Sequence, residues 1–255
     1  MLMNTKLLHG TVIHSTDGEV GTVDDIYFDD QSWAVRYFTV DTEGWMGGPQ
    51  VLISPTAVSR IDWQAKQLYV TLTKAQVQNS PGIDDHVPVA MQHEEDFATY
   101  NGLEADSTGH PVEPASDATP VDGITDEVTI NLRKQLLDAH LRSNSEVDGY
   151  YIEATDGEIG HVESLIVDDQ SWHIRYLEIG TRSWWPGKKV LVSPEWVQKV
   201  SWEESKVYVD ITRDAIQNCE EFDESTPVTR QYEQRIFAHY GKAPYWLTSH
   251  LASSR

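Results

Sequence analysis

The chain has 255 residues, a length that fits one large domain or two small ones. Its 19 Lys and Arg against 41 Asp and Glu give a formal net charge of −22, which argues against nucleic-acid binding, because such proteins concentrate cations that displace phosphate counterions. Its 9 Trp and 11 Tyr argue against wholesale disorder. The single cysteine, Cys219, excludes an intramolecular disulfide and a two-cysteine metal clamp.

The opening residues, MLMNTKLLHG, lack the apolar core and the small-residue cleavage site of a secretory signal. No stretch approaches the ~18 to 20 apolar residues that are needed to span a bilayer. We therefore expect a cytoplasmic protein without a transmembrane segment.

One segment of the sequence occurs twice. Residues 15–42 read STDGEVGTVDDIYFDDQSWAVRYFTVDT, and residues 154–181, 139 positions further on, read ATDGEIGHVESLIVDDQSWHIRYLEIGT. The same offset continues without a gap to Val89 and Val228. The repeat predicts two copies of one folding unit, at residues 5–102 and 144–245.

Each copy contains short segments rich in β-branched and aromatic residues, separated by turn residues. In the first copy the predicted strands are 20–29, 33–42, 51–54, 57–63 and 67–73. Asp17-Gly18 and Asp156-Gly157 supply the residue types that tolerate a tight hairpin turn. Five or six short strands that close on each other leave few exposed edges, and this favours a small barrel.

Short helices are predicted after the last strand of each copy. Thr73 and Thr212 each begin a single helical turn, and Thr73 with Gln76 fits a capping box that the second copy lacks. Pro88 and Pro227 are well placed as the first residues of longer helices.

The segment between the copies differs in composition. Residues 103–123 are dense in Pro, Ser, Thr, Asp and Gly, which is typical of a polar linker. The leucines that follow are spaced for a short amphipathic helix over residues 124–143, with Thr125 as its cap.

The repeated motifs resemble those of the PRC-barrel family. The marks are DGEVGTVDDIYFDD, SWAVRYFTVDT, VLISP and YVTLTKAQVQNSP in the first copy, and DGEIGHVESLIVDD, SWHIRYLEIGT, VLVSP and VYVDITRDAIQN in the second. The resemblance implies a mainly β protein with two small PRC-type barrels in tandem, each followed by a short helix. PRC-barrels include the cytoplasmic domain of the photosynthetic reaction-centre H subunit, whose membrane helix this sequence lacks. They also include the C-terminal domain of a ribosome maturation factor, which has a different domain in place of a second barrel.

Motifs of catalysis are missing from the sequence. It contains no G-x-S-x-G elbow, phosphate-binding glycine loop, H-E-x-x-H or G-x-G-x-x-G motif. Paired carboxylates can act as acid and base, but in an acidic chain solvated turns explain the Asp pairs better. We therefore expect neither enzymatic activity nor a cofactor.

Acidic residues and histidines are the candidate metal ligands of the sequence. Acidic pairs follow the long predicted strand of both copies at Asp29, Asp30, Asp168 and Asp169. These pairs lack the spacing of a twelve-residue calcium loop, and His86 and His93 lack a histidine partner one helical turn away. We expect no functional metal site.

Two loops rich in glycine, proline and large aromatics are the best candidates for partner binding, because Trp is enriched at binding hot spots. Their candidate residues are Trp45, Met46, Trp184, Trp185, Lys188 and Lys189. Plugging of a barrel mouth, or docking of one barrel on the other, explains these loops nearly as well. Arg36 and Arg175 lie at matched strand positions and are predicted to form structural ion pairs with acidic neighbours, with ligand binding as the alternative.

These features together predict a non-catalytic scaffold or adaptor whose partners are other proteins or a second copy of the chain. One alternative is the binding of a small ligand or metal in a cleft between the barrels. Another, implied by the family resemblance alone, is a role like that of the H subunit in photosynthetic electron transfer.

Overall fold

We describe the protein from a computed structural model, in residues 1–42, 50–80, 140–181 and 187–247. The chain divides into two compact units, and unit 1 takes residues from both copies of the repeat. Unit 1 consists of Met1–His9, Ser32–Val35 and Ser143–Arg255, and unit 2 consists of Gly10–Gln31 and Arg36–Arg142. The predicted linker, Pro88 and the first part of the predicted helix at 124–143 lie outside the described residues.

Unit 2 is built on a seven-stranded sheet. Its strands are β2 (Val12–Ser15), β3 (Gly18–Asp29), β4 (Val35–Asp41), β5 (Val51–Ile53), β6 (Val58–Asp62), β7 (Gln67–Val70) and β8 (Leu141–Ser143). The sheet runs in the order β5-β4-β3-β2-β7-β6, and β8 pairs with β3 off this path. β2 and β7 are parallel, whereas β2–β3, β4–β5 and β6–β7 are antiparallel. All five strands predicted for the first copy are confirmed.

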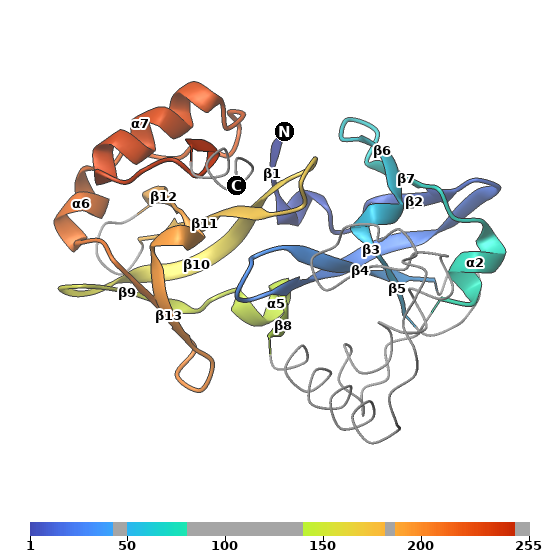
Figure 1. Cartoon of the computed structure of the whole chain (residues 1–255), viewed down its shortest axis with the longest axis horizontal. Helices are drawn as coiled ribbons and strands as arrows, with labels where there is room; N and C mark the ends of the chain where they lie inside the picture. The colour runs from blue at the N-terminus through green and yellow to red at the C-terminus, as the bar shows by residue number, and fades with distance from the viewer. Residues whose placement is uncertain (43–49, 81–139, 182–186, 248–255) are drawn as a thin grey trace, which may run out of the picture. The chain divides into compact units, whose positions relative to one another are not determined.

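Unit 1 repeats this sheet with the second copy. Its strands are β1 (Leu2–Asn4), β9 (Tyr151–Ala154), β10 (Gly157–Asp168), β11 (Ile174–Gly180), β12 (Lys189–Val192), β13 (Val197–Ser201) and β14 (Lys206–Val209). The order is β12-β11-β10-β9-β14-β13, with β1 paired to β10 off the path. The two mixed sheets confirm a mainly β protein made from a duplicated unit (Figure 1).

The two sheets exchange short segments at matched places. β1 precedes the first copy in sequence but pairs with β10 of the second, and β8 precedes the second copy but pairs with β3 of the first. Unit 1 also holds the turn Ser32–Val35, where the amide of Val35 donates to the carbonyl of Trp172 (2.7 Å) and that of Ile174 to the carbonyl of Trp33 (2.8 Å). Unit 1 is therefore built from both copies, and unit 2 is completed by β8 from the segment before the second copy.

Two matched glycines let the long strands β3 and β10 bend. Gly21 and Gly160 have φ of +142° and +155°, a region that side chains rarely adopt. A Cβ on either glycine would lie 2.1 Å from the carbonyl oxygen of the facing strand, Asp41 or Gly180. The ladder between β9 and β10 also shifts register beside Gly160, as in a β-bulge.

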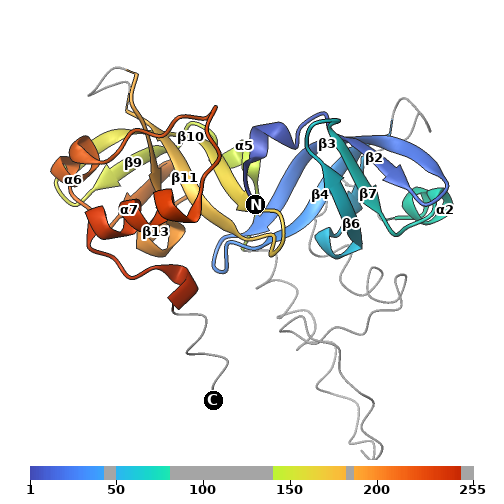
Figure 2. The same cartoon turned by 90° about the horizontal axis from the view of Figure 1, so that it is seen from above.

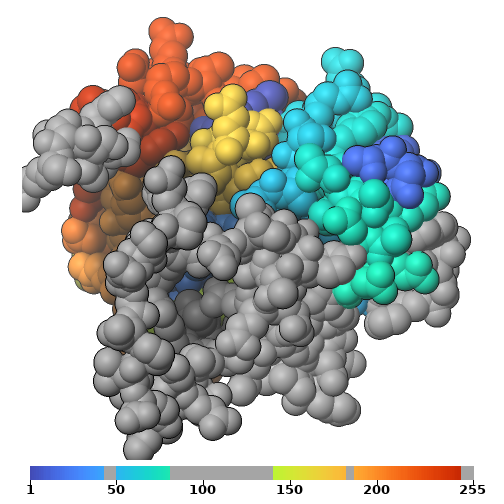
Figure 3. All heavy atoms as spheres, turned by 45° about the vertical axis from the view of Figure 1, so that its right-hand side comes forward, coloured from blue at the N-terminus to red at the C-terminus, as the bar shows by residue number. Residues whose placement is uncertain are grey.

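Helices follow the last strand of each copy. α2 (Lys74–Gln78) begins at the capping box predicted for Thr73 and Gln76, and Figure 2 shows it beside the hairpin of β2 and β3. α6 (Arg213–Asn218) begins at Thr212, whose hydroxyl accepts from the amide of Ala215. α7 (Arg230–Tyr240) carries Phe237 into the core of unit 1, with its ring centroid 5.2 Å from that of Trp196. The C-terminal residues, orange and red in Figure 3, form part of the surface of this unit.

Two helix predictions need correction. Pro227 is not the first residue of a helix, because the hydroxyl of Thr229 caps α7 by accepting from the amide of Tyr232. The predicted helix at 124–143 does not reach its last residues, because Leu141–Ser143 form β8 and pair with β3. The first correction comes from a cap two residues further along the chain, and the second from a strand partner far away in the sequence. No helix in the described ranges is long and apolar enough to cross a membrane.

Candidate functional site

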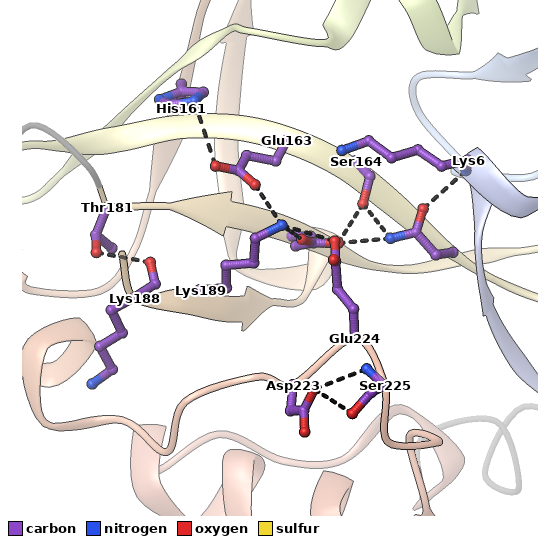
Figure 4. Close-up of polar contacts among 12 residues, drawn as sticks. Lys6, His161, Glu163, Ser164, Thr181, Lys188, Lys189, Asp223, Glu224 and Ser225 are labelled. Atoms are coloured by element: carbon purple, nitrogen blue, oxygen red, sulfur yellow. Dashed lines mark hydrogen bonds and ion pairs between the residues drawn. The ribbon is translucent and has the colours of Figure 1, made fainter. Parts of the chain in front are cut away.

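A charged cluster in unit 1 gathers one lysine and three glutamates. At its centre the Lys189 ammonium lies 2.6 Å from Glu163 Oε2, 2.7 Å from Glu178 Oε1 and 2.8 Å from Glu224 Oε1 (Figure 4). His161 Nε2 lies 3.8 Å from Glu163 Oε1 at the edge of the cluster. Three carboxylates therefore surround one ammonium group.

Neighbouring strands bring these side chains together. Glu163 comes from β10, Glu178 from β11 and Lys189 from the first position of β12, and β11 pairs with both other strands. The Glu163 carboxylate lies against Gly180. A Cβ atom added at position 180 would lie 2.0 Å from Glu163 Oε1. This position of the Glu163 side chain is therefore sterically possible only with a glycine at position 180.

Glu178 is fully buried, and other polar groups satisfy its second oxygen. Its Oε2 accepts from Ser164 Oγ (2.5 Å) and from Asn4 Nδ2 (2.7 Å). Asn4 Nδ2 also donates to Ser164 Oγ (2.8 Å). Asn4 belongs to β1, so the exchanged segment supplies part of the hydrogen bonding that a buried carboxylate requires.

The cluster shifts the titration of its members. Burial, together with a hydrogen bond to Glu224, raises the pKa of Glu178, against the opposing effects of Lys189 and Ser164. The pKa of Glu224, which is more exposed, is lowered by its hydrogen bonds to Glu178 and Lys189. Burial acts to lower the pKa of Lys189, but hydrogen bonds to the three glutamates outweigh it, and the net shift is upward.

These shifts limit the chemistry of the cluster. A lysine acts as a nucleophile or base only when it loses its proton, and the raised pKa keeps Lys189 protonated at neutral pH. Its ammonium occupies the space between the carboxylates, and the described residues contain no group of three or more His, Cys, Asp or Glu side chains placed to hold a metal ion. The geometry suits an internal electrostatic anchor for β1 and β12.

The predicted partner-binding residues fall into two groups. Trp45, Met46, Trp184 and Trp185 lie outside the described residues. Lys189 is the centre of the cluster, and Lys188 Nζ donates to the carbonyl oxygens of Gln217 and Cys219 (2.6 Å each). The structure thus places both amines on partners within unit 1, and their role in partner binding stays a prediction.

The two predicted ion-pair arginines differ in environment. Arg36 is exposed on β4. The guanidinium carbon of Arg175 lies 4.3 Å from the ring centroid of Tyr245, and its Nη2 donates to Ser171 Oγ (3.2 Å). Burial raises the pKa of Glu195, and the charge of Arg175 partly offsets this. Arg175 is therefore held mainly by stacking on an aromatic ring.

The acidic pairs after the long strands have partners within the chain. Asp30 Oδ1 lies 2.8 Å from His140 Nδ1, and Asp30 Oδ2 lies 3.5 Å from Arg142 Nε, in the segment that holds β8 against unit 2. Asp168 accepts from the amide of Gln170 (3.2 Å) and from the hydroxyl of Ser171 (2.8 Å) within its own turn. His86 and His93 lie outside the described residues.

Sequence reasoning missed the glutamates and Asn4. A signal was present: at matched positions, Glu178 replaces Thr39 and Lys189 replaces Gln50. The second copy thus carries a negative and a positive side chain where the first copy has two uncharged ones. This indicates that the two charged side chains contact each other. Asn4 carried no such signal, because its role depends on the exchange of β1.

The fold is that of a duplicated β protein, and the charged cluster around Lys189 holds strands of unit 1 together. The sequence matches the PRC-barrel domain at residues 4–77 and again at residues 142–216. The chain therefore belongs to the PRC-barrel family and carries two of its domains. No curated protein matches the chain.

Proposed function

We propose that the chain is a cytoplasmic, non-catalytic scaffold that binds protein partners through its two PRC-barrel domains. The observation that carries this proposal is the duplication of a surface feature along with the domain. A chain with two like sites gains avidity for a partner that offers two contacts, provided that both can be engaged together.

The duplicated feature is a row of side chains across three strands. In unit 2 the row is His14, Tyr69 and Arg60, at directly paired positions of β2, β7 and β6. The rings of His14 and Tyr69 stack with centroids 5.1 Å apart, and the Arg60 guanidinium carbon lies 4.2 Å from the Tyr69 centroid. Tyr69 is half-buried and Arg60 is exposed.

Unit 1 has the matching row of Glu153, Tyr208 and Lys199. Here the Lys199 ammonium lies 5.6 Å from the Tyr208 centroid, and Glu153 Oε2 pairs with Lys206 (3.4 Å). Tyrosine and arginine are enriched at binding hot spots. Both rows thus present a cation over a tyrosine, while the exchange of His14 for Glu153 lets the two sites differ in charge preference.

Affinity capture with the full-length chain tests the proposal. Tagged protein is used as bait in a lysate of the source cell, and the retained proteins are identified by mass spectrometry. We expect Tyr69→Ala with Tyr208→Ala to reduce retention of a specific partner at least tenfold, and each single change to reduce it less. A second bait, Trp45→Ala with Trp184→Ala, tests the loops that the sequence indicates.

A matched control uses Gln64→Ala with Glu203→Ala, two exposed positions at the same place in the two copies. This bait should retain the same proteins as the unaltered chain. If the unaltered chain retains nothing above the level of an unrelated acidic protein, or if neither double variant changes what it retains, the scaffold proposal is wrong.

A further inference from the structure

β1 lies in a slot of unit 1 with a backbone partner on each side. One side is the end of β10, which pairs with β1 in antiparallel register, Met3 opposite Val167. The other side is formed at Val228, which makes an antiparallel bridge with Leu2. The slot therefore accepts an extended strand rather than a helix or an isolated side chain.

The slot also requires polar groups from its occupant. Asn4 donates to the buried carboxylate of Glu178 and to Ser164, and Thr5 Oγ1 accepts from the amide of Leu165 (3.3 Å). Met3 and Thr5 are buried, and Leu8 is only 1% exposed. An empty slot would remove the Asn4 donor from the buried carboxylate of Glu178 and expose apolar surface, and both cost free energy.

The chain passes from this slot to unit 2 between His9 and Gly10. The amide of Gly10 is already fixed in unit 2, where it donates to the carbonyl of Val23 (2.8 Å). Gly10 has φ of +73°, and a Cβ there would meet nothing within 4 Å. A left-handed glycine in open space lets the crossing change direction at low steric cost.

We propose that the segment Met1–His9 of one molecule occupies the β10 slot of a second copy of this chain, which gives a strand-exchanged dimer. The exchanged strand makes the same hydrogen bonds and buries the same side chains as the strand of the same chain does. Exchange of an identical element between copies is a low-cost route to dimers for this reason. The dimer uses the slot and not the tyrosine rows, so it does not depend on the proposed partner binding.

A disulfide across the slot shows which chain supplies the strand. Because the amide of Asp169 donates to the carbonyl of Met1, Leu2 and Asp168 form a non-hydrogen-bonded pair. Such pairs have Cα atoms about 4.5 Å apart, within the range of a disulfide. Leu2→Cys and Asp168→Cys are combined with Cys219→Ala, and the full chain is refolded from urea at several concentrations and oxidised with glutathione disulfide.

We expect a covalent dimer, at twice the chain mass of 28.9 kDa on a non-reducing gel. Its share should rise at least fivefold over a roughly hundredfold increase in protein concentration, because mass action favours association. The control pair Glu153→Cys and Glu158→Cys joins the two strands of one hairpin and must stay within one chain at every concentration. A slot disulfide that forms only within one chain, or a dimer share that does not change with concentration, overturns the proposal.

A second measurement does not depend on cysteine substitutions. Unaltered chains with natural and with heavy nitrogen are unfolded together, refolded at high concentration and examined by native mass spectrometry. We expect a mixed dimer that decreases severalfold when residues 1–9 are deleted. The absence of a mixed dimer, or one that the deletion leaves unchanged, also overturns the proposal.

Discussion

Units 1 and 2 have the same strand order but carry different polar side chains at matched positions. In unit 2 the buried position on β4 is Thr39, whose Oγ1 accepts from the amide of Asp25 (2.7 Å). Gln50 Nε2 donates to Asp24 Oδ2 at the surface (2.8 Å). In unit 1 the matched positions are Glu178 and Lys189, which form the charged cluster.

The difference shows how much support a buried charge requires on an unchanged backbone. The hydroxyl of Thr39 is satisfied by the backbone of Asp25 alone, whereas the carboxylate of Glu178 needs Lys189, Ser164 and the side-chain amide of Asn4 in β1. Replacing a buried ion pair with uncharged groups is often neutral in stability, but removing one member leaves the other without compensation. The charged version therefore makes unit 1 depend on β1 in a way that unit 2, at this position, does not depend on β8.

The largest expected effect follows from removing the ammonium group at the centre of the cluster. Lys189→Met leaves Glu178 buried without its counter-ion and should destabilise unit 1 by about 3 to 5 kcal/mol. Gln50→Met at the matched surface position of unit 2 should change stability by less than about 0.5 kcal/mol. Urea unfolding followed by hydrogen exchange in the peptides of each unit measures both values. Equal losses in the two units would contradict an electrostatic role for the cluster.

A smaller effect is expected from the space that Glu163 occupies. Gly180→Ala places a Cβ within 2.0 Å of Glu163 Oε1, and overpacking of this kind costs about 1 to 3 kcal/mol. Unit 2 has Asp41 at the matched position, so the backbone itself accepts a side chain there. In a Glu163→Ala background the Gly180→Ala change should therefore cost much less, and a double-mutant cycle measures the difference. Additive losses would show that the clash is with the backbone.

The pH dependence of stability should also distinguish the units. The raised pKa of Glu178 means that the folded state holds its proton more tightly than the unfolded state does. The stability from this group is present below the unfolded pKa of about 4.3 and is lost as pH rises through the higher folded value. Glu178→Gln removes this loss, so its stability relative to the unaltered chain should rise with pH across that window.

Urea midpoints between pH 4 and pH 8 measure this slope, which for one proton cannot exceed about 1.4 kcal/mol per pH unit. The lowered pKa of Glu224 acts in the opposite direction, and its stabilisation is lost as pH falls. Thr39→Val in unit 2 removes no titrating group and should leave the slope unchanged. A parallel pH profile for Glu178→Gln and the unaltered chain would contradict the raised pKa.

Sequence patterns predicted the elements whose causes are local. Strands, hairpin turns and the Thr73 cap follow from residues within a few positions of each other, and all are present. β8 was predicted as helix because leucine spacing is local evidence, whereas its pairing with β3 comes from far away in the sequence. The cluster was missed for the same reason. Asn4 and Glu178 are 174 positions apart in the sequence, and the pairing of β1 with β10 brings them together.

The smallest expected effect concerns the caps of the two short helices. Thr73 and Gln76 satisfy each other's backbone amides, whereas Thr212 accepts from Ala215 without a reciprocal side chain. Loss of a capping threonine typically costs about 0.5 to 2 kcal/mol, and Thr73→Ala should lie above Thr212→Ala because it also removes the hydroxyl that donates to Gln76 Oε1 (3.1 Å). Gln76→Ala should remove this excess, so that the two helices respond equally when their unfolding is measured by hydrogen exchange. Equal costs in the unaltered background would mean that the reciprocal bond contributes nothing, and that the threonine hydroxyl alone fixes where each helix begins.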